Sequence, residues 1–183
     1  MKILVLCIAW LFIFSSCSSK RRNTEQLKNN SQPEAKFVLT HPVWLIDSAG
    51  VQRLIHERNG KILLLNIWAT WCLPCIEEFP DLIKLAREDT ALEVVGISID
   101  YPDEIDSKVV PFLAKLKVPF RVCVAKYAKQ ENFISTLDTN WNGAIPATYI
   151  YDLKGKQIFS AIGEQTYEQF KKIVNLSREK KPS

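Results

Sequence analysis

The sequence predicts an α/β domain with a central mixed β-sheet flanked by helices. Apolar runs that suit strands alternate with segments of helical apolar spacing along most of the chain. The run Ile62–Ile67 is almost continuously apolar, as a strand covered on both faces requires. Near the C-terminus, two strand patterns joined by a hairpin precede an amphipathic helix. With 183 residues and 47% hydrophobic content, the chain can build one substantial core.

The N-terminus has the pattern of an export signal. Lys2 precedes the uncharged run Ile3–Phe14, which is too short for a comfortable membrane span but suits the core of a signal peptide. Small residues before Cys17 resemble a bacterial lipoprotein signal, so we expect a signal peptide over 1–16 and lipid on Cys17. An uncleaved anchor and ordinary signal cleavage are the alternatives. Each one exports the domain to an environment where disulfides persist.

Composition divides the remainder of the chain. Residues 17–36 are polar without apolar periodicity, which predicts a flexible tether. The folded domain is expected over 37–178, followed by a tail at 179–183. The net charge of +4 is mild and spread along the chain, so it indicates no nucleic-acid partner.

The first half of the domain is expected to carry three strands and two helices. Asp47 or Ser48 suits the N-cap of the first helix, which ends at Asn59-Gly60. Pro74 falls in the first turn of the second helix, where its missing N–H costs little, and Pro80 falls inside that helix. The expected elements are strands at 37–39, 43–46 and 62–67, and helices at about 48–58 and 73–88.

The second half is expected to continue the alternation and then turn antiparallel. Asp152–Lys156 connects the last two strands as a hairpin. Ile145-Pro146 opens the first of these strands after a glycine-containing turn, so this bond is a candidate cis peptide. The expected elements are strands at 92–99, 120–124, 147–151 and 157–162, and helices at 105–117, 130–137 and 164–177.

Cys72 and Cys75 lie at the junction of the central strand and the helix that follows. Two cysteines separated by two residues at a helix N-terminus can close a disulfide across one turn. The unpaired N–H groups and positive dipole end of the helix favour a thiolate there. We expect Cys72 at the exposed mouth of the turn and Cys75 one turn deeper. The pair therefore predicts a thiol–disulfide oxidoreductase.

Other uses of the two thiols need residues that the sequence does not supply. Zinc would normally require two more ligands, and neither His41 nor His56 has a matching spacing. Covalent haem attachment would need a histidine directly after Cys75. A purely structural disulfide remains an alternative, although so short a loop restricts little chain entropy. Cys123, within an apolar strand pattern, is expected to be a buried small hydrophobe.

Several motifs together resemble one family of exported bacterial proteins. They are Leu65–Cys75, which contains Trp-Cys-Leu-Pro-Cys, then Glu78–Pro80, and Gly143–Thr148 leading into Tyr149–Asp152. Residues 37–177 resemble the thioredoxin-like fold and are most similar to the membrane-tethered TlpA/ResA-type thiol–disulfide oxidoreductases. The resemblance implies a thioredoxin-like domain with an extra helix–strand insertion.

The resemblance also implies roles for individual residues. Cys72 would be the nucleophile that forms a mixed disulfide with substrate, and Cys75 would be the resolving thiol. Pro146, in cis, would lie against the sulfurs, with Ile145 offering its backbone to the partner. Glu78 matches the family's active-site glutamate, which can exchange a proton with a thiol. The alternative for Glu78 is a first-turn acid that complements the helix dipole.

The same resemblance suggests how the protein meets its partners. Trp71 is expected to pack over the disulfide, and Trp71, Leu73, Pro74 and Ile145 are candidate substrate contacts. Protein disulfides are the implied substrates, a membrane protein is a possible electron donor, and the reducing direction is favoured. The implied location is the cell envelope, facing the periplasm, with cytochrome c maturation as one possible setting.

Two other functions compete with disulfide exchange. A thiol peroxidase of the related peroxiredoxin group would need a threonine three residues before the cysteine and a proline further upstream, whereas Thr70 lies two residues before Cys72. A non-enzymatic copper or zinc carrier would use the two thiols but lacks a well-placed histidine. Asn66 occupies the place of the buried aspartate of ordinary thioredoxin, so that route of proton transfer is excluded.

Overall fold

The computed structural model describes residues 41–56, 60–126, 133 and 136–179. The predicted signal peptide, the lipidation site Cys17, the tether and the strand at 37–39 lie outside these residues, as does most of the helix at 130–137. The described elements are β1 (Trp44–Ile46), α1 (Ser48–His56), β2 (Ile62–Trp68), α2 (Leu73–Glu88), β3 (Leu92–Ser98), a 3₁₀ turn (Pro102–Glu104), a π-helical turn (Ile105–Val109), α3 (Val110–Leu116), β4 (Arg121–Ala125), β5 (Ala147–Tyr151), β6 (Gln157–Ile162) and α5 (Tyr167–Glu179).

A six-stranded mixed sheet organises these elements, in the order β1-β4-β3-β2-β5-β6. The first four strands of this order are parallel, whereas β5 and β6 run antiparallel to their neighbours. The helix α3 and the strand β4 follow β3 in the chain. The predicted mixed α/β architecture is therefore confirmed.

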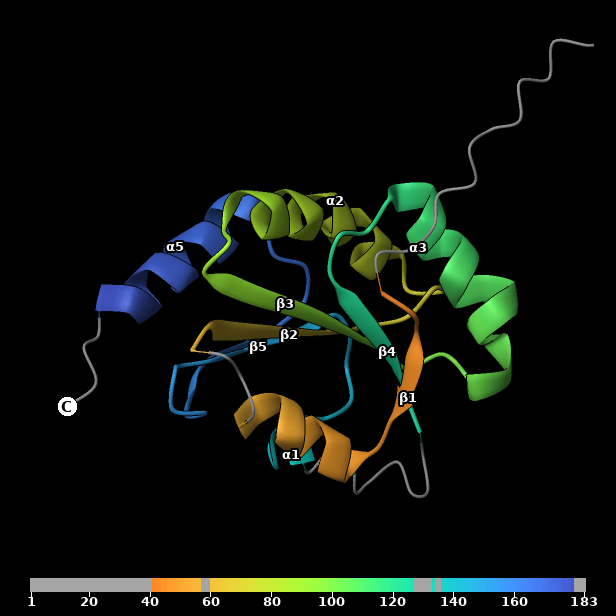
Figure 1. Cartoon of the computed structure of the whole chain (residues 1–183), viewed down its shortest axis with the longest axis horizontal. Coiled ribbons are helices and arrows are strands. Elements are labelled where there is room, and N and C mark those ends of the chain that lie inside the picture. Colours follow the sequence, from red (N-terminus) through yellow and green to blue (C-terminus); the bar gives the residue numbers. More distant parts are fainter. Residues whose placement is uncertain (1–40, 57–59, 127–132, 134–135, 180–183) are drawn as a thin grey trace, which may run out of the picture. The chain divides into compact units, whose positions relative to one another are not determined.

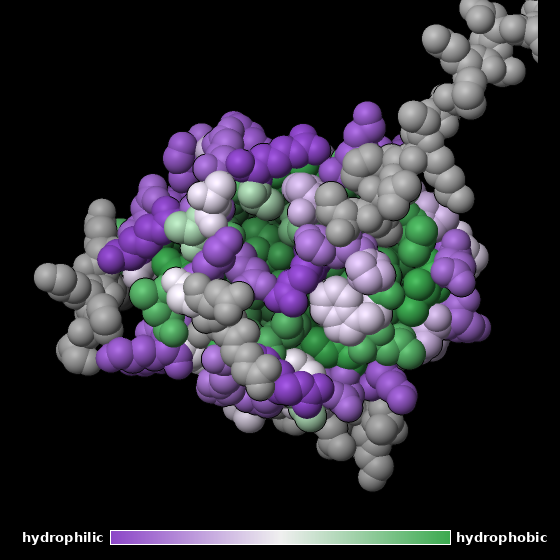
Figure 2. Space-filling model, in the orientation of Figure 1, coloured by the Kyte–Doolittle hydropathy of each residue, from purple (hydrophilic) through white to green (hydrophobic). Residues whose placement is uncertain are grey.

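Helices lie on both faces of the sheet. Figure 1 shows α2, α3 and α5 on one side and α1 on the other. Residues of β2 alternate between the two cores: Leu64 and Trp68 join the core under α2 and α5, whereas Leu63, Leu65 and Ile67 join the core that contains α1. Every residue of β2 is buried, as its apolar sequence predicted. In Figure 2, hydrophilic residues cover the outer sides of the helices and hydrophobic residues show between them.

The final helix begins later than the sequence predicted. It starts at Tyr167 rather than Glu164 because Thr166 forms a capping box with Gln169. The Gln169 side chain accepts from the Thr166 N–H at 2.7 Å, and the Thr166 hydroxyl accepts from the Gln169 N–H at 3.4 Å. The residue before the cap, Gln165, consequently remains in a loop that reaches α2.

The helix predicted at 105–117 is also divided. A π-helical turn covers Ile105–Val109, and the regular helix begins only at Val110. Pro111 has no N–H to donate to the preceding turn, so it is accommodated in the first turn of α3 instead. Lys117 ends α3 in a left-handed conformation with φ 53°. Throughout the part of the chain that is described, no helix combines the length and apolar character needed to cross a bilayer.

Candidate active site

A tight turn carries the chain from β2 into α2. The Cys72 N–H donates to the Ala69 carbonyl at 3.2 Å, which closes the turn. Cys72 then takes the N-cap position of α2 with extended backbone angles, φ −91° and ψ 103°. Pro74 falls within the first turn of the helix, as predicted. The sequence therefore places both cysteines within one turn of the helix start.

Cys72 and Cys75 form a disulfide with an S–S distance of 2.03 Å and a Cα–Cα distance of 5.2 Å. The Cys72 Sγ also accepts from the Cys75 N–H at 3.3 Å. Cys72 is the more accessible of the two, as expected, but only 6% of it is exposed and Cys75 is fully buried. The expectation of an exposed Cys72 is thus wrong in degree, because Cys72 belongs to an apolar cluster against which Ile145 packs.

The loop before β5 reaches the same end of the sheet. The Ile145–Pro146 peptide bond is cis, as predicted from the sequence. The backbone register pairs Ala147 with Ile67, so Pro146 lies near the end of β2 from which the cysteine turn begins. The Gly163 N–H donates to the Pro146 carbonyl at 2.8 Å, and the Trp141 indole N–H donates to the Ala144 carbonyl at 2.8 Å. These bonds hold the loop on both sides of the cis bond.

Glu78 is buried one helical turn after Cys75, with 1% of its surface exposed. Its Oε1 accepts from the Asn66 side-chain amide at 2.5 Å, and its Oε2 accepts from the Gln165 N–H at 2.7 Å. Burial raises the pKa of Glu78 from 4.5 to about 7, and the two hydrogen bonds only partly oppose that rise. A carboxyl group with this pKa can hold or release a proton near neutral pH.

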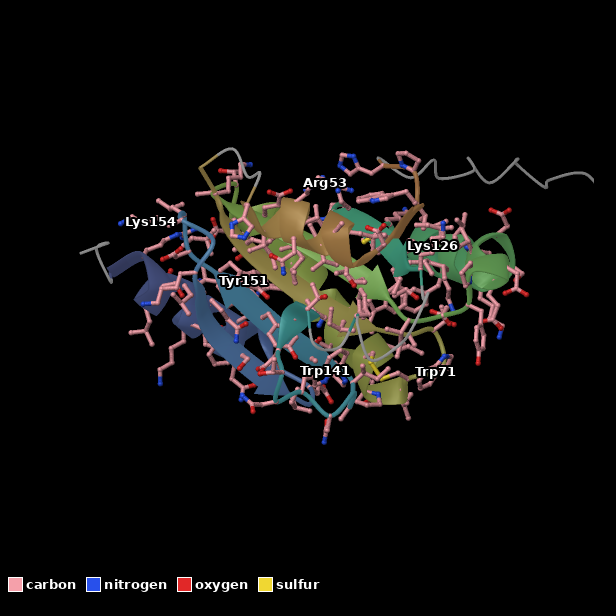
Figure 3. All side chains as sticks on the ribbon, turned by 90° about the horizontal axis from the view of Figure 1, so that it is seen from below. Arg53, Trp71, Lys126, Trp141, Tyr151 and Lys154 are labelled. Atoms are coloured by element: carbon pink, nitrogen blue, oxygen red, sulfur yellow. A yellow bond between two sulfur atoms is a disulfide. The ribbon has the colours of Figure 1, made fainter. Side chains whose placement is uncertain are left out.

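The candidate substrate contacts form the accessible rim of the site. Trp71 and Leu73 flank Cys72 and are 62% and 64% exposed, respectively. Pro74 is exposed and Ile145 is half-buried. Figure 3 shows Trp71 at the end of the sheet that carries the disulfide. Trp68 differs from Trp71: it is fully buried and packs edge-to-face on Phe79, with ring centroids 4.5 Å apart.

Sequence reasoning missed three residues that the tertiary structure brings to the site. Asn66 was considered only as the residue that replaces the buried aspartate of ordinary thioredoxin, yet its side-chain amide donates to Glu78. Gln165, from the loop before α5, had no local pattern that marked it. Asp100 lies two residues after the end of β3, and its buried carboxylate accepts from the backbone N–H and the hydroxyl of Thr70. A polar residue next to or inside an apolar strand was the available indication for Asn66 and Asp100.

The third cysteine that the structure describes, Cys123, lies apart from the Cys72–Cys75 disulfide. Cys123 is buried in β4 on the opposite face of the sheet, and burial raises the pKa of its thiol to about 12. Its Sγ lies 3.7 Å from the Gly96 carbonyl oxygen. Among the residues that the structure describes, no group of three or more His, Cys, Asp or Glu side chains could hold a metal ion.

This combination of a mixed sheet, a Cys-x-x-Cys disulfide at a helix N-terminus and a neighbouring cis-proline defines a thioredoxin-like protein. The AhpC/TSA family matches residues 36–157. The chain is 32% identical over 123 residues to the thiol-disulfide oxidoreductase ResA of Bacillus anthracis, covering 67% of each chain. It is 30% identical over 156 residues to the thiol:disulfide interchange protein HelX of Rhodobacter capsulatus, covering 82% of each chain.

A solved structure agrees with these sequence matches. The thioredoxin-related protein from Neisseria meningitidis serogroup B has a TM-score of 0.58 at 27% identity, over 68% of this chain and 90% of that one. The chain belongs to the AhpC/TSA family and, within it, to the thioredoxin-like thiol–disulfide oxidoreductases. The family resemblance inferred from the sequence motifs is confirmed.

Proposed function

We propose that this protein reduces disulfides in exported proteins through the Cys72–Cys75 pair. The observation that carries the proposal is the position of the disulfide, with Cys72 at the N-cap of α2 and on the more accessible side. A thiolate at Cys72 would face the N–H of Cys75 and the positive end of the helix dipole, both of which stabilise it. The reducing direction is supported by the resemblance to ResA-type proteins.

The exchange would proceed in two steps that balance electrons and protons. In the reduced protein, the Cys72 thiolate attacks one substrate sulfur, and the other substrate sulfur leaves as a thiolate. Cys75 then loses its proton and attacks the Cys72 sulfur, which expels the second substrate thiolate. The substrate gains two electrons and becomes a dithiol by taking up the Cys75 proton and one proton from solvent, while Cys72 and Cys75 regain the disulfide seen in the structure. A dithiol donor must then reduce the pair again.

Glu78 is proposed to serve the second step as proton acceptor for Cys75. The two residues lie one turn apart on the same helix, and both are buried. Because its pKa of about 7 lies close to neutral pH, Glu78 is ionised in a substantial fraction of molecules and can take up the Cys75 proton. Asn66 and Gln165 hold the carboxylate by one oxygen each.

The accessible rim is proposed as the docking surface for the substrate. Trp71, Leu73 and Pro74 are exposed around Cys72, and Ile145 lies on the opposing loop. Exposed apolar side chains next to a reactive thiol favour partners that present an apolar segment around their disulfide. We expect the backbone of Ile145, which precedes the cis bond to Pro146, to pair with such a segment.

We further propose that the protein acts at the periplasm-facing side of the cell envelope, anchored by lipid on Cys17. The support is the signal-like N-terminus, with its uncharged run and the small residues before Cys17. A polar tether over 17–36 would separate the catalytic domain from the membrane surface. In this position a membrane dithiol protein is the natural electron donor. Loss of radiolabelled palmitate and of membrane association in Cys17→Ser would support the anchor, and retention of both would refute it.

Insulin reduction in the presence of dithiothreitol tests the main proposal. We expect wild-type protein to accelerate insulin precipitation, Cys72→Ser to abolish the acceleration, and Cys123→Ser to retain it as a matched control. A measured reduction potential tests the direction. Relatives of this fold span roughly −270 to −120 mV, and a value near the upper end would indicate an oxidant rather than a reductant.

Peroxide consumption separates disulfide exchange from a thiol peroxidase. The Thr70 hydroxyl donates its proton to Asp100 at 2.5 Å, so that proton is not free to form a hydrogen bond to a peroxide at Cys72. We therefore expect no peroxide-dependent oxidation of the reduced pair faster than that of free dithiol. Rapid peroxide consumption by the wild type would favour the peroxidase instead. Native mass spectrometry of the reduced protein with copper or zinc tests the metal-carrier alternative.

A further inference from the structure

Asp100 forms a buried side-chain cluster beside the cysteine turn, and the exchange chemistry described above does not use it. Asp100 is fully buried two residues after the end of β3. Its carboxylate accepts three hydrogen bonds: from the Thr70 N–H at 2.9 Å, the Thr70 hydroxyl at 2.5 Å and the Ser98 hydroxyl at 2.6 Å. Burying a carboxylate is costly unless donors surround it, so all three donors are held strongly.

Thr70 supplies two of the three donors, and it lies inside the turn that ends at Cys72. The Cys72 N–H closes that turn on the Ala69 carbonyl. The Ile99 N–H donates to the Trp68 carbonyl at 2.8 Å, which ties the end of β3 to the end of β2 just before the turn begins. The main-chain pairing of β3 with β2 stops at this bond. Beyond it, the Asp100 side chain still joins the segment after β3 to Thr70 in the segment after β2.

The residue type at position 100 suits this task. An ionised carboxylate only accepts hydrogen bonds, so it can receive all three donors without presenting a donor of its own. An amide in the same place would direct an NH₂ group toward one of the donors. The Ser98 hydroxyl also accepts from the Asp100 N–H at 2.9 Å, which fixes the backbone of Asp100 itself. The cluster is thus built to hold Thr70 in one position.

The position of the Cys72 sulfur depends on this turn. Cys72 is the N-cap of α2, and its Sγ receives the Cys75 N–H at 3.3 Å. Only two bonds separate the Cys72 Cα from its sulfur, so a shift of the turn moves the sulfur away from the helix N–H groups. Because those groups and the helix dipole stabilise a thiolate, the turn sets how readily Cys72 ionises.

We propose that Asp100 and Thr70 are positioning residues for the redox reaction: together they hold the Ala69–Cys72 turn so that the Cys72 sulfur stays at the N-terminus of α2. This inference rests on the proposed function only in naming Cys72 as the reactive thiol. It concerns the ionisation of Cys72, which can be measured without any protein substrate.

Thr70→Val tests the proposal because it removes the hydroxyl donor and leaves the charge of Asp100 in place. We expect the Cys72 thiol pKa in the reduced protein, measured from the pH dependence of iodoacetamide alkylation, to rise by about half a unit to one unit. Alkylation at pH 7 should slow about three- to tenfold. The disulfide should become harder to reduce by glutathione by a similar factor. Thr70→Ser keeps a hydroxyl and should restore wild-type values.

Ser98→Ala tests whether the effect passes through Asp100. It removes the third donor and the acceptor of the Asp100 N–H but leaves both Thr70 donors in place, so we expect it to lower stability and to raise the Cys72 pKa less than Thr70→Val does. If Thr70→Val does not fold, Thr70→Ala provides the same measurement, because it also removes the hydroxyl donor and leaves Asp100 in place.

The outcomes separate this inference from the proposed function. Equal Cys72 pKa values and equal glutathione equilibria in Thr70→Val, Thr70→Ser and wild type would overturn the positioning role, even if stability fell. A raised pKa in Thr70→Val with wild-type behaviour in Thr70→Ser, and a smaller rise in Ser98→Ala, would support it. Failure of the wild-type protein to reduce insulin would refute the proposed function and leave the pKa comparison valid.

Discussion

The Asn66 side-chain amide donates to the Oε1 of Glu78 at 2.5 Å, which joins the central strand β2 to α2. The second Glu78 oxygen receives the Gln165 N–H from the loop before α5. Both donors favour the charged carboxylate, yet burial outweighs them and keeps the pKa near 7. Near neutral pH, both the protonated and the ionised forms of the buried Glu78 side chain are therefore populated.

Glu78→Gln should reduce the loss of stability between pH 5 and pH 8. The pKa of Glu78 is about 7 in the native state against 4.5 for the free group, so the native state binds more protons over this interval and stability falls as pH rises. Between pH 5 and pH 8, the free energy of unfolding of the wild type should fall by up to about 3 kcal/mol more than that of Glu78→Gln. Urea unfolding at the two pH values measures the difference. Glu77→Gln, which changes an exposed neighbour, is the control and should follow the wild type.

Glu78→Gln should also change the pH profile of the resolving step. In the wild type, the rate at which Cys75 releases a mixed disulfide should rise as pH increases through about 7, because ionised Glu78 accepts the thiol proton. The variant should be slower at pH 7, by about 10²-fold at most, and its rate should rise only as Cys75 itself ionises. This step can be measured by preparing the mixed disulfide with a peptide thiol and recording the release of that thiol after rapid mixing. Identical profiles would remove Glu78 from the mechanism.

Cys75→Ser should trap the substrate, whereas Cys72→Ser should not. Without a resolving thiol, the mixed disulfide on Cys72 persists, and non-reducing electrophoresis with mass spectrometry would place the substrate sulfur on Cys72. The burial of Cys75 explains the asymmetry, since only Cys72 retains exposed surface. A mixed disulfide that forms on Cys75 in Cys72→Ser at a similar rate would reverse the assigned roles.

Trp71→Ala and Leu73→Ala should weaken reaction with protein disulfides more than with small ones. Both side chains are exposed beside Cys72, so we expect kcat/KM for insulin to fall several-fold, equivalent to about 1 kcal/mol each. The rate with glutathione disulfide should change little. Leu153→Ala removes an equally exposed hydrophobic side chain, 57% accessible, from the hairpin between β5 and β6, and should have no effect on either substrate.

Cys123 should be unreactive in the folded, reduced protein. Its thiol is buried and its pKa is raised to about 12, so almost no thiolate exists at neutral pH. Iodoacetamide at pH 7.5 should therefore modify Cys72 readily and Cys123 only after unfolding in denaturant. Peptide mapping by mass spectrometry distinguishes the sites. Native labelling of Cys123 at a rate comparable to that of Cys72 would contradict the buried position in β4.

Local patterns in the sequence predicted much of the architecture. The apolar run of β2, the spacing of α2 and the hairpin of β5 and β6 were predicted within a few residues, since burial on a strand or one helix face leaves a period that the sequence records. Cys72 and Cys75 were predicted as a pair because three residues at a helix start bring two sulfurs within bonding distance. The late start of α5 was not predicted, because a capping box competes with helical periodicity at its first turn.

The sequence alone therefore determined the strand-and-helix order and the disulfide, because both depend on neighbours within a few residues. The tertiary structure decided which distant polar groups meet at the site. Asn66, Gln165 and Glu78 are far apart in the chain, as are Thr70 and Asp100, and only the sheet order and helix packing bring them into hydrogen-bonding distance. The pKa of Glu78 and the position of the Cys72 sulfur depend on those contacts, so no local pattern could have predicted them.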